Sequence, residues 1–257
     1  MGLFDWLGVV WHCGGMNVHA RAGEDTSPLL RAIDVGDKKL VRVLLDWGAD
    51  PNDTSCTYPL YAALSKKDAD IVRVLAERGA SLDLAFTKGI QKDAPEFGLN
   101  ALGLAIFHEK YELAQFLLAK GASAECENNR GLTPLMMACK SGPLNVIESI
   151  IKTGVCINSR TKAKKAKHRR SALMFAMAEQ RMDVIGLLVK NGADTDIGCV
   201  DGESILTLVL QKSKAELALL LIEQEADFSL SNEDGLFPIS LASSKGQRSN
   251  QCGRGPN

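Results

Sequence analysis

Features on which membrane-spanning and disulfide-bonded proteins depend are missing from this sequence. No apolar run approaches the roughly 18 residues of a membrane span, so we expect no transmembrane segment. The seven cysteines are odd in number, scattered, and without a Cys-x-x-Cys pair. This pattern is typical of buried, reduced thiols and disfavours both a disulfide framework and a zinc site. The sequence therefore predicts a reducing compartment, the cytoplasm, with the nucleus as the alternative.

Signatures of catalysis are missing as well. The sequence contains neither a glycine-rich phosphate loop nor a Gly-x-Ser-x-Gly turn. The four histidines, His12, His19, His108 and His168, show no metal-ligand or nucleophile spacing. Because function has to be argued from a site and no site of this kind is visible, we predict no enzyme, no cofactor and no metal ion.

What the sequence does contain begins with an uneven distribution of charge. Hydrophobic residues make up 46% and charged residues 24% of the 257 positions, as in a globular protein. The formal net charge is only -1. Seven of the 30 Lys and Arg residues lie between Arg160 and Arg170, where no acid occurs, so the rest of the chain carries -8. The sequence predicts an acidic body with one basic segment.

One pattern recurs along nearly the whole chain. It reads SPLLRAIDVGDKKLVRVLLDWGADPN from Ser27 and returns as YPLYAALSKKDADIVRVLAERGASLD from Tyr58. The copies align on an apolar anchor, which is Leu29, Leu60, Leu102, Leu135, Leu173 or Leu206, and Ile239 in a closing half copy. Successive anchors are 31, 42, 33, 38, 33 and 33 residues apart, so the period is 33 with surplus residues in two places. A period of this length is typical of stacked repeat units.

Each copy predicts two helices. A Ser, Thr or Asn before the anchor can cap the first helix, as at Ser27 and Asn100, and proline often follows at its first position. A small residue three places after the anchor, such as Ala32, lets neighbouring helices approach. Apolar runs such as LVRVLL predict a second helix that faces the core. Glycine 19 residues after the anchor ends that helix in a left-handed conformation, although Glu225 takes its place in the sixth copy.

This unit resembles the ankyrin repeat, and TPLMMACKSG from Thr133 to Gly142 matches the family best. The resemblance implies an all-α, ankyrin-type helix-turn-helix solenoid of about six full repeats plus a C-terminal half repeat. We assign residues 1–16 to an N-terminal helix or cap, 17–246 to the repeat domain and 247–257 to a disordered tail. One departure is that no copy has the His that usually follows Thr-Pro-Leu.

The N-terminal segment MGLFDWLGVVWHC can form a short helix with a wide apolar face. We expect this helix to cover the open side of the first repeat. The alternative is that it lies on a membrane surface.

The resemblance implies non-catalytic protein binding through a concave surface, loop tips and the exposed ends of the first helices. The candidate residues outside the basic segment are Lys66, Phe107, His108, Arg130, Lys140, Glu179, Gln211 and Lys212. Phe107 is either an interface anchor or a side chain that folds onto the neighbouring long loop. We expect a monomer whose partner is a protein.

Two surplus segments follow second helices, near 84–98 and 160–170. The first reads LAFTKGIQKDAPEF and has apolar residues Phe86, Ile90 and Phe97, which predict an ordered flap, with partner contact as the alternative.

The second segment is basic, and its candidate site residues are Lys164, Lys165, Lys167, Arg169 and Arg170. Three interpretations remain open: a solvated loop, a contact with an acidic protein surface, and the nuclear-import pattern KKAK. Nucleic-acid binding is disfavoured, because no aromatic residues are interleaved and the acidic body repels phosphates. A nuclear or nucleic-acid-associated adaptor nevertheless stays the alternative function.

Overall fold

The computed structural model describes residues 26–53, 57–87, 91–162, 169–195 and 205–224, together with 226, 229, 235, 237–240 and 243. Twelve α-helices, α2 to α13, lie within these residues, residues 238–240 and 243 are helical as well, and no element among them is a strand. The expected all-α fold class is confirmed. The chain divides into two compact units, residues 1–134 and 135–257.

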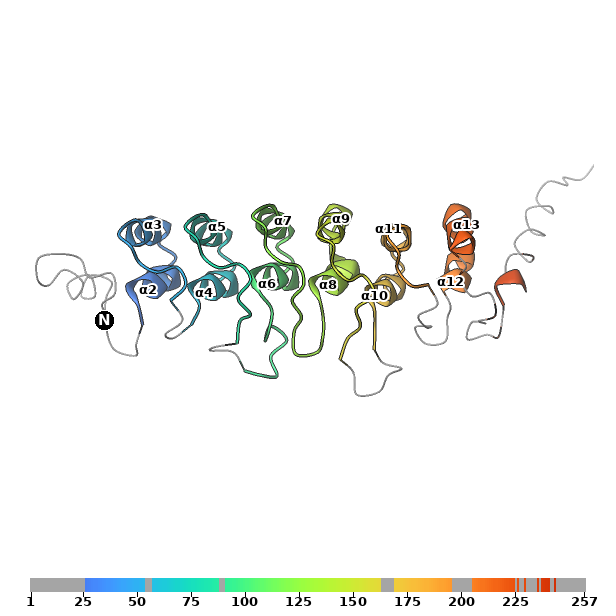
Figure 1. The fold of residues 1–257 in the computed structure, drawn as a ribbon, viewed down its shortest axis with the longest axis horizontal. Helices are drawn as coiled ribbons and strands as arrows, with labels where there is room; N and C mark the ends of the chain where they lie inside the picture. The colour runs from blue at the N-terminus through green and yellow to red at the C-terminus, as the bar shows by residue number, and fades with distance from the viewer. Residues whose placement is uncertain are drawn as a thin grey trace, which may run out of the picture. The chain divides into compact units, whose positions relative to one another are not determined.

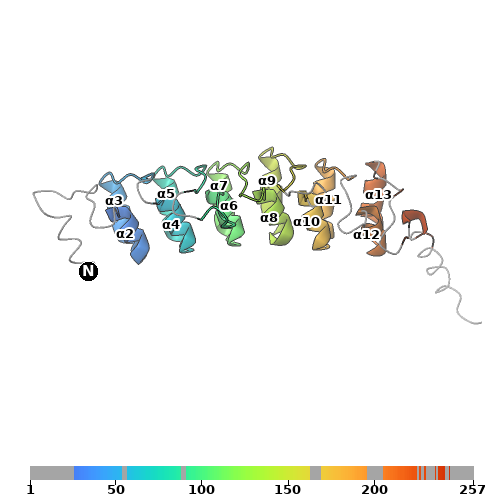
Figure 2. The ribbon, with the colours of Figure 1, turned by 90° about the horizontal axis from the view of Figure 1, so that it is seen from below.

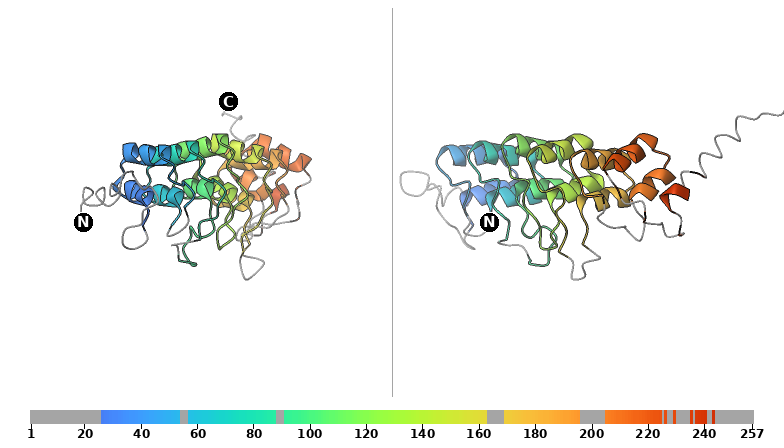
Figure 3. Two further views of the ribbon diagram at one scale, coloured as in Figure 1. Left: turned by 60° about the vertical axis from the view of Figure 1, so that its left-hand side comes forward. Right: turned by 45° about the vertical axis from the view of Figure 1, so that its right-hand side comes forward.

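The first unit contains three pairs of helices. They are α2 (Pro28–Val35) with α3 (Lys38–Asp46), α4 (Pro59–Ser65) with α5 (Ala69–Glu77), and α6 (Ala101–Phe107) with α7 (Tyr111–Ala119). The first helices of the pairs form one row and the second helices another, as Figure 1 shows. The described parts of the loops after α5 and α7 extend beyond the row of first helices (Figures 1 and 3).

The second unit repeats this arrangement. Its pairs are α8 (Pro134–Ser141) with α9 (Leu144–Lys152), α10 (Ala172–Ala178) with α11 (Met182–Lys190), and α12 (Ile205–Gln211) with α13 (Ala215–Glu223). Figure 2 views the pairs from below and shows first and second helices overlying each other in each pair. Each of the six aligned copies of the sequence pattern thus forms two helices.

The predicted caps explain where the first helices begin. Ser27 Oγ accepts a hydrogen bond from Leu30 N at 3.3 Å, and Asn100 Oδ1 accepts one from Gly103 N at 2.9 Å. Ser171 caps α10 in the same way, through Met174 N at 3.4 Å. These bonds satisfy amide groups that have no partner inside the helix, so the N-cap predictions are confirmed at these positions.

The core consists of the residues that the pattern predicts. The anchors of the six copies are all buried, with at most 3% of each side chain exposed. The small residues three places later are buried as well, at Ala32, Ala63, Ala105, Ala138, Ala176 and Val209. The glycines that end the second helices have φ between 83° and 91°, at Gly48, Gly79, Gly121, Gly154 and Gly192. Glu225, at the same place in the sixth copy, lies outside the described residues.

The turn between the two helices of a pair holds a feature that the pattern did not reveal. Seven residues after the anchor, the backbone is left-handed at Gly36, with φ of 78°, and also at four side chains that are not glycine. These are Lys67 (60°), Glu109 (58°), Gln180 (54°) and Ser213 (56°). A residue with a Cβ has a strained backbone in this region. The tight turn between the two helices of a pair therefore costs a small amount of folding free energy at these four residues.

Candidate partner-binding surface

The candidate residues outside the loops share one place in the fold, the C-terminal end of a first helix. Lys66, His108 and Glu179 are the C-caps of α4, α6 and α10. Lys140 lies in the last turn of α8. Phe107 is the last residue of α6 and Gln211 of α12, with Lys212 directly after it. The side chains of Lys140, Glu179 and Lys212 are exposed.

Lys66 lies at this surface but already has a partner in the preceding repeat. Its Nζ is 3.2 Å from an Asp34 carboxylate oxygen and donates to the Asp34 carbonyl oxygen at 2.9 Å. Both side chains remain 46% exposed. An exposed ion pair of this kind contributes about 0–1 kcal/mol, so the Lys66 ammonium can be recruited by a partner at small cost.

Phe107 and His108 form a compact aromatic pair. Their rings meet edge to face, with centroids 5.3 Å apart, and both residues are half-buried. Burial lowers the pKa of His108 below its usual value of 6.5; the charges of Lys67 and Lys110 act in the same direction, and Glu96 opposes them. The imidazole is therefore neutral at pH 7, when it can both donate and accept a hydrogen bond.

The first inserted segment is anchored as the sequence predicts. Phe86 is only 1% exposed, and its ring packs against those of Tyr58 and Tyr61, at centroid distances of 5.5 and 5.3 Å. Its backbone pairs with the far end of the segment, since Phe86 N donates to Leu99 O at 2.8 Å. Phe97 is half-buried, and Ile90 lies outside the described residues. The prediction of an ordered flap is confirmed for its described part.

Two asparagines of the next loop hold this flap, and sequence reasoning missed both. Asn128, 2% exposed, donates from Nδ2 to Pro95 O at 2.8 Å, and its Oδ1 accepts from Arg130 N and Leu132 N. Asn129 donates from Nδ2 to Lys92 O at 2.6 Å. The only signal was the turn composition of ENNRG, which is typical of Asx turns. Arg130 projects from this turn and is exposed.

The basic segment is closed at its base. Thr161 N donates to Arg170 O at 3.0 Å, and Arg170 N donates to Thr161 Oγ1 at 2.9 Å. The side chains of Arg169 and Arg170 are exposed. Lys164, Lys165 and Lys167 lie outside the described residues. The base of the segment is therefore fixed through backbone atoms and one threonine hydroxyl.

A second set of polar side chains links adjacent repeats at the loops after second helices. Asn52 donates from Nδ2 to Gly79 O at 3.1 Å and accepts from Ser81 N at 2.7 Å. Asn158, in the fourth copy, makes the same two contacts with the fifth, to Gly192 O at 3.1 Å and from Asp194 N at 2.9 Å. Both asparagines occupy the position 23 residues after the anchor. The loops beside the candidate surface are thus tied together within each unit.

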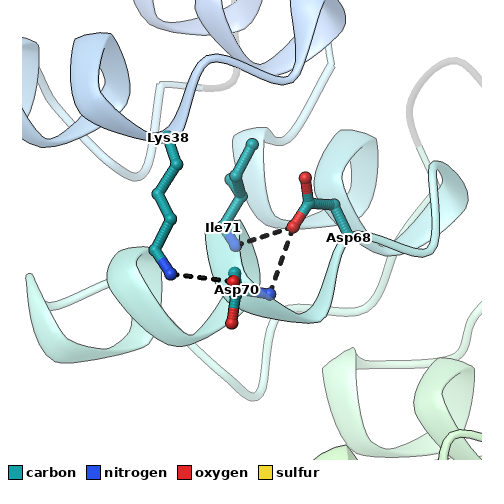
Figure 4. A network of polar contacts seen from close by, with 4 residues as sticks. All are labelled: Lys38, Asp68, Asp70 and Ile71. Atoms are coloured by element: carbon teal, nitrogen blue, oxygen red, sulfur yellow. Dashed lines mark hydrogen bonds and ion pairs between the residues drawn. The ribbon is translucent and has the colours of Figure 1, made fainter.

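The second helices of the first unit are linked by charge. Lys38 Nζ lies 2.8 Å from the carboxylate of Asp70 (Figure 4). Asp70 is two residues after the N-cap Asp68, which accepts hydrogen bonds from Asp70 N and Ile71 N, each at 3.1 Å. The hydrogen bond from Lys38, and then its charge, lower the pKa of the exposed Asp70 carboxyl. Arg78 pairs with Asp46 in the same way. These contacts link the neighbouring second helices α3 and α5.

The described cysteines are free thiols. Cys139 is buried, and burial raises its pKa to about 12, while Cys126 is partly buried and donates to Asn100 Oδ1 at 3.0 Å. Cys156 is exposed, so the expectation of burial is wrong for this residue, which follows the end of a helix where the chain turns through solvent. Within the described ranges no three His, Cys, Asp or Glu side chains are grouped to hold a metal ion. A search of the same residues found no helix of sufficient length and hydropathy to cross a membrane.

Comparison with known proteins points to one family. Residues 84–161 and 102–199 match the family model of ankyrin repeats in three copies. The crystal structure of the ankyrin repeat domain of Bcl-3 superposes with a TM-score of 0.60, covering 89% of this chain and 99% of that one at 24% identity, which shows the fold. The chain is also 28% identical over 266 residues to the ankyrin repeat and KH domain-containing protein mask-1 of Caenorhabditis elegans, covering 93% of this chain and 10% of that protein.

Other curated relatives are larger proteins. The chain is 26% identical over 185 residues to the nuclear factor NF-kappa-B p105 subunit of Gallus gallus, covering 70% of this chain and 18% of that subunit. It is 29% identical over 241 residues to the human transient receptor potential cation channel subfamily A member 1, covering 89% of this chain and 20% of the channel. The chain thus spans only a small part of the curated relatives that it matches.

Proposed function

Because the chain belongs to the ankyrin repeat family, we propose that it is a non-catalytic module that binds another protein. Binding uses the concave surface that stacked repeats create, the exposed ends of the first helices and the loops beside them. The partner is a protein, and the module works as a scaffold, adaptor or inhibitor in the cytoplasm.

One observation carries this proposal: the buried positions of the repeats are uniform and the first-helix ends are not. Every anchor is leucine in the six copies and is buried. Five residues later every copy has a different residue, which is Asp34, Ser65, Phe107, Lys140, Ala178 or Gln211, and the next position varies as well, for example Lys66, His108 and Glu179. Variable side chains on a constant framework allow recognition of a partner without disturbing the core.

The basic segment adds an electrostatic contact. The chain outside residues 160–170 has a formal net charge of -8. The cations of this segment are therefore the part of the sequence suited to contact an acidic protein surface. The alternative, a nuclear or nucleic-acid-associated adaptor, uses the same cations on phosphates. A salt titration separates the two, because affinity for a phosphate backbone falls steeply with salt in proportion to the contacts made.

The test compares two triple variants as bait for partners captured from the source cells. Lys140→Ala, Glu179→Ala and Lys212→Ala together remove three exposed charges at first-helix ends. The matched control, Lys39→Ala, Glu77→Ala and Lys152→Ala, removes the same charges from second helices, where these residues are also exposed. We expect the partner to bind the wild type and the control equally and to be lost from the first variant. Equal recovery with both variants contradicts the proposed surface.

A further inference from the structure

A groove lies on the second helices of the second unit, away from the first-helix ends. It runs between α11 and α13, reaches the side of α9, and encloses about 620 Å³. A second hollow of about 420 Å³ continues between the start of α11 and the start of α13, and the two share Met182, Asp183, Glu216 and Leu217. We call the two together the α11–α13 groove.

The groove is open because α11 has a glycine where other second helices have a long side chain. Thirteen residues after the anchor stand Arg42, Arg73, Gln115, Glu148, Gly186 and Leu219. A methyl group on Gly186 would meet only Leu217 Cδ1, at 3.6 Å, so this space is not closed by another element. Glycine inside a helix costs about 0.5–1 kcal/mol relative to alanine. The packing around Gly186 does not require a glycine, because a Cβ would fit there.

The walls of the groove are apolar. Leu219 of α13 occupies the position that corresponds to Gly186 of α11, and it is 60% exposed. The next residue, Leu220, also lines the groove. Leu187 and Leu217 are half-buried and line the space between the helices. Large aliphatic side chains gathered on one exposed face typically mark an interaction surface.

The rim of the groove is acidic. Glu148, Asp183, Glu216 and Glu223 line it against two cations, Lys190 and Lys214. Among the described residues none of these four carboxylates forms an ion pair. Like charges around a low-dielectric surface attract a partner of opposite sign.

We propose that the α11–α13 groove binds a cationic amphipathic helix of a partner protein. The helix places apolar residues at i, i+3 or i+4, and i+7 against Leu187, Leu217 and Leu219, and its Lys or Arg residues meet the rim carboxylates. Since α11 has nine residues, at 1.5 Å each it is about 13 Å long, which matches a partner segment of two to three turns. The chain's own basic segment does not fit, because TKAKKAKHRR has no side chain larger than alanine for the apolar contacts.

The test uses synthetic helical peptides of about 12 residues and the full chain, with fluorescence anisotropy as the measurement. The first peptide has Leu on one face and Lys on the other, the second has Glu in place of Lys, and the third is a scrambled version of the first. We expect the Leu/Lys peptide to bind at least tenfold more tightly than the other two, with affinity that falls as salt rises. Equal binding of the scrambled peptide overturns the proposal, because charge alone then explains the interaction.

A variant that fills the groove separates binding from folding. Gly186→Met places a long side chain in the open space and improves helix propensity, so we expect unchanged or higher thermal stability and at least a tenfold loss of peptide affinity. Gln115→Met adds the same side chain at the same register of α7 and should bind the peptide as the wild type does. Undiminished binding by Gly186→Met overturns the proposal.

The rim is tested by Asp183→Asn, Glu216→Gln and Glu223→Gln together, which should weaken peptide binding and flatten its salt dependence. Asp70→Asn, Glu77→Gln and Glu112→Gln on α5 and α7 make the matched control. Two other occupants are examined with the same proteins. A dimer that Gly186→Met dissociates assigns the groove to a second copy, and binding to neutral lipid vesicles that Gly186→Met abolishes assigns it to a membrane surface; either result overturns the proposal.

Discussion

The left-handed residues in the turns between paired helices are sites of local backbone strain. Glu109 and Gln180 have φ of 58° and 54° at the position where the first repeat has Gly36. We predict that Glu109→Gly and Gln180→Gly each raise the free energy of unfolding by about 0.5–1 kcal/mol, because glycine adopts this conformation without a Cβ clash. Chemical denaturation measures the change, and Gly36→Gln should shift it the opposite way. A loss of stability in both glycine variants would show that side-chain contacts outweigh the strain.

Asn128 is a single residue on which two loops depend. Asn128→Ala leaves Pro95 O, Arg130 N and Leu132 N without their bonds at a site that is 2% exposed. We predict a loss of about 1–3 kcal/mol in unfolding free energy, together with faster amide exchange in residues 91–97. Asn191→Ala is the control, since Asn191 is exposed and its side chain donates to Leu187 O in the helix that it follows. Unchanged exchange in residues 91–97 would refute the role of Asn128 as a clamp.

His108 makes stability depend on pH. Its folded pKa lies below 6.5, mainly because of burial. Above pH 6.5 the ring is neutral in both states, and as the pH falls through that value the unfolded chain takes up a proton that the folded chain resists. We predict that the wild type loses more thermal stability than His108→Gln between about pH 7.5 and pH 5. Equal losses, measured by calorimetry on both proteins, count against this prediction.

Among the structural elements, the basic segment is the one that we expect to be separable from the fold. Its base is closed through Arg170 N, Arg170 O and Thr161, and none of these contacts uses a guanidinium group. We predict that neutralising Lys164, Lys165, Lys167, Arg169 and Arg170 together leaves the melting temperature nearly unchanged. Partner association should become slower, because exposed charges steer encounter more than they hold a complex. Unfolding would make the segment structural, and an unchanged association rate would leave it a solvated loop.

On the scale of the whole molecule, stability is a sum of repeats and of whatever covers their open sides. In the first described pair of helices, Val35, Val43 and Trp47 are 55%, 37% and 51% exposed. The apolar N-terminal segment lies outside the described residues, and its sequence suits it to cover such side chains. We predict that deleting residues 1–13 lowers stability or solubility, measured by thermal melting and sedimentation. A truncated protein that melts unchanged and stays soluble points instead to a membrane or partner role.

The sequence by itself determined the paired helices, their caps, their core and their glycine ends. Ser27 and Asn100 cap first helices through amides three residues away, and Gly48 and Gly79 follow the ends of second helices with a positive φ. These signals could be predicted because each depends on a few neighbouring residues and returns with the period of 33.

Tertiary structure alone decided how the repeats are held together and where the second surface opens. Asn52 and Asn128 bond to carbonyl groups 27 and 33 residues away, and these contacts exist only once adjacent repeats have stacked. The α11–α13 groove likewise needs Gly186 and Leu217 to lie on neighbouring helices with no side chain between them. In the sequence these residues look like ordinary turn or helix residues. Their roles depend on distances between elements, which arise from tertiary packing and not from the local chain.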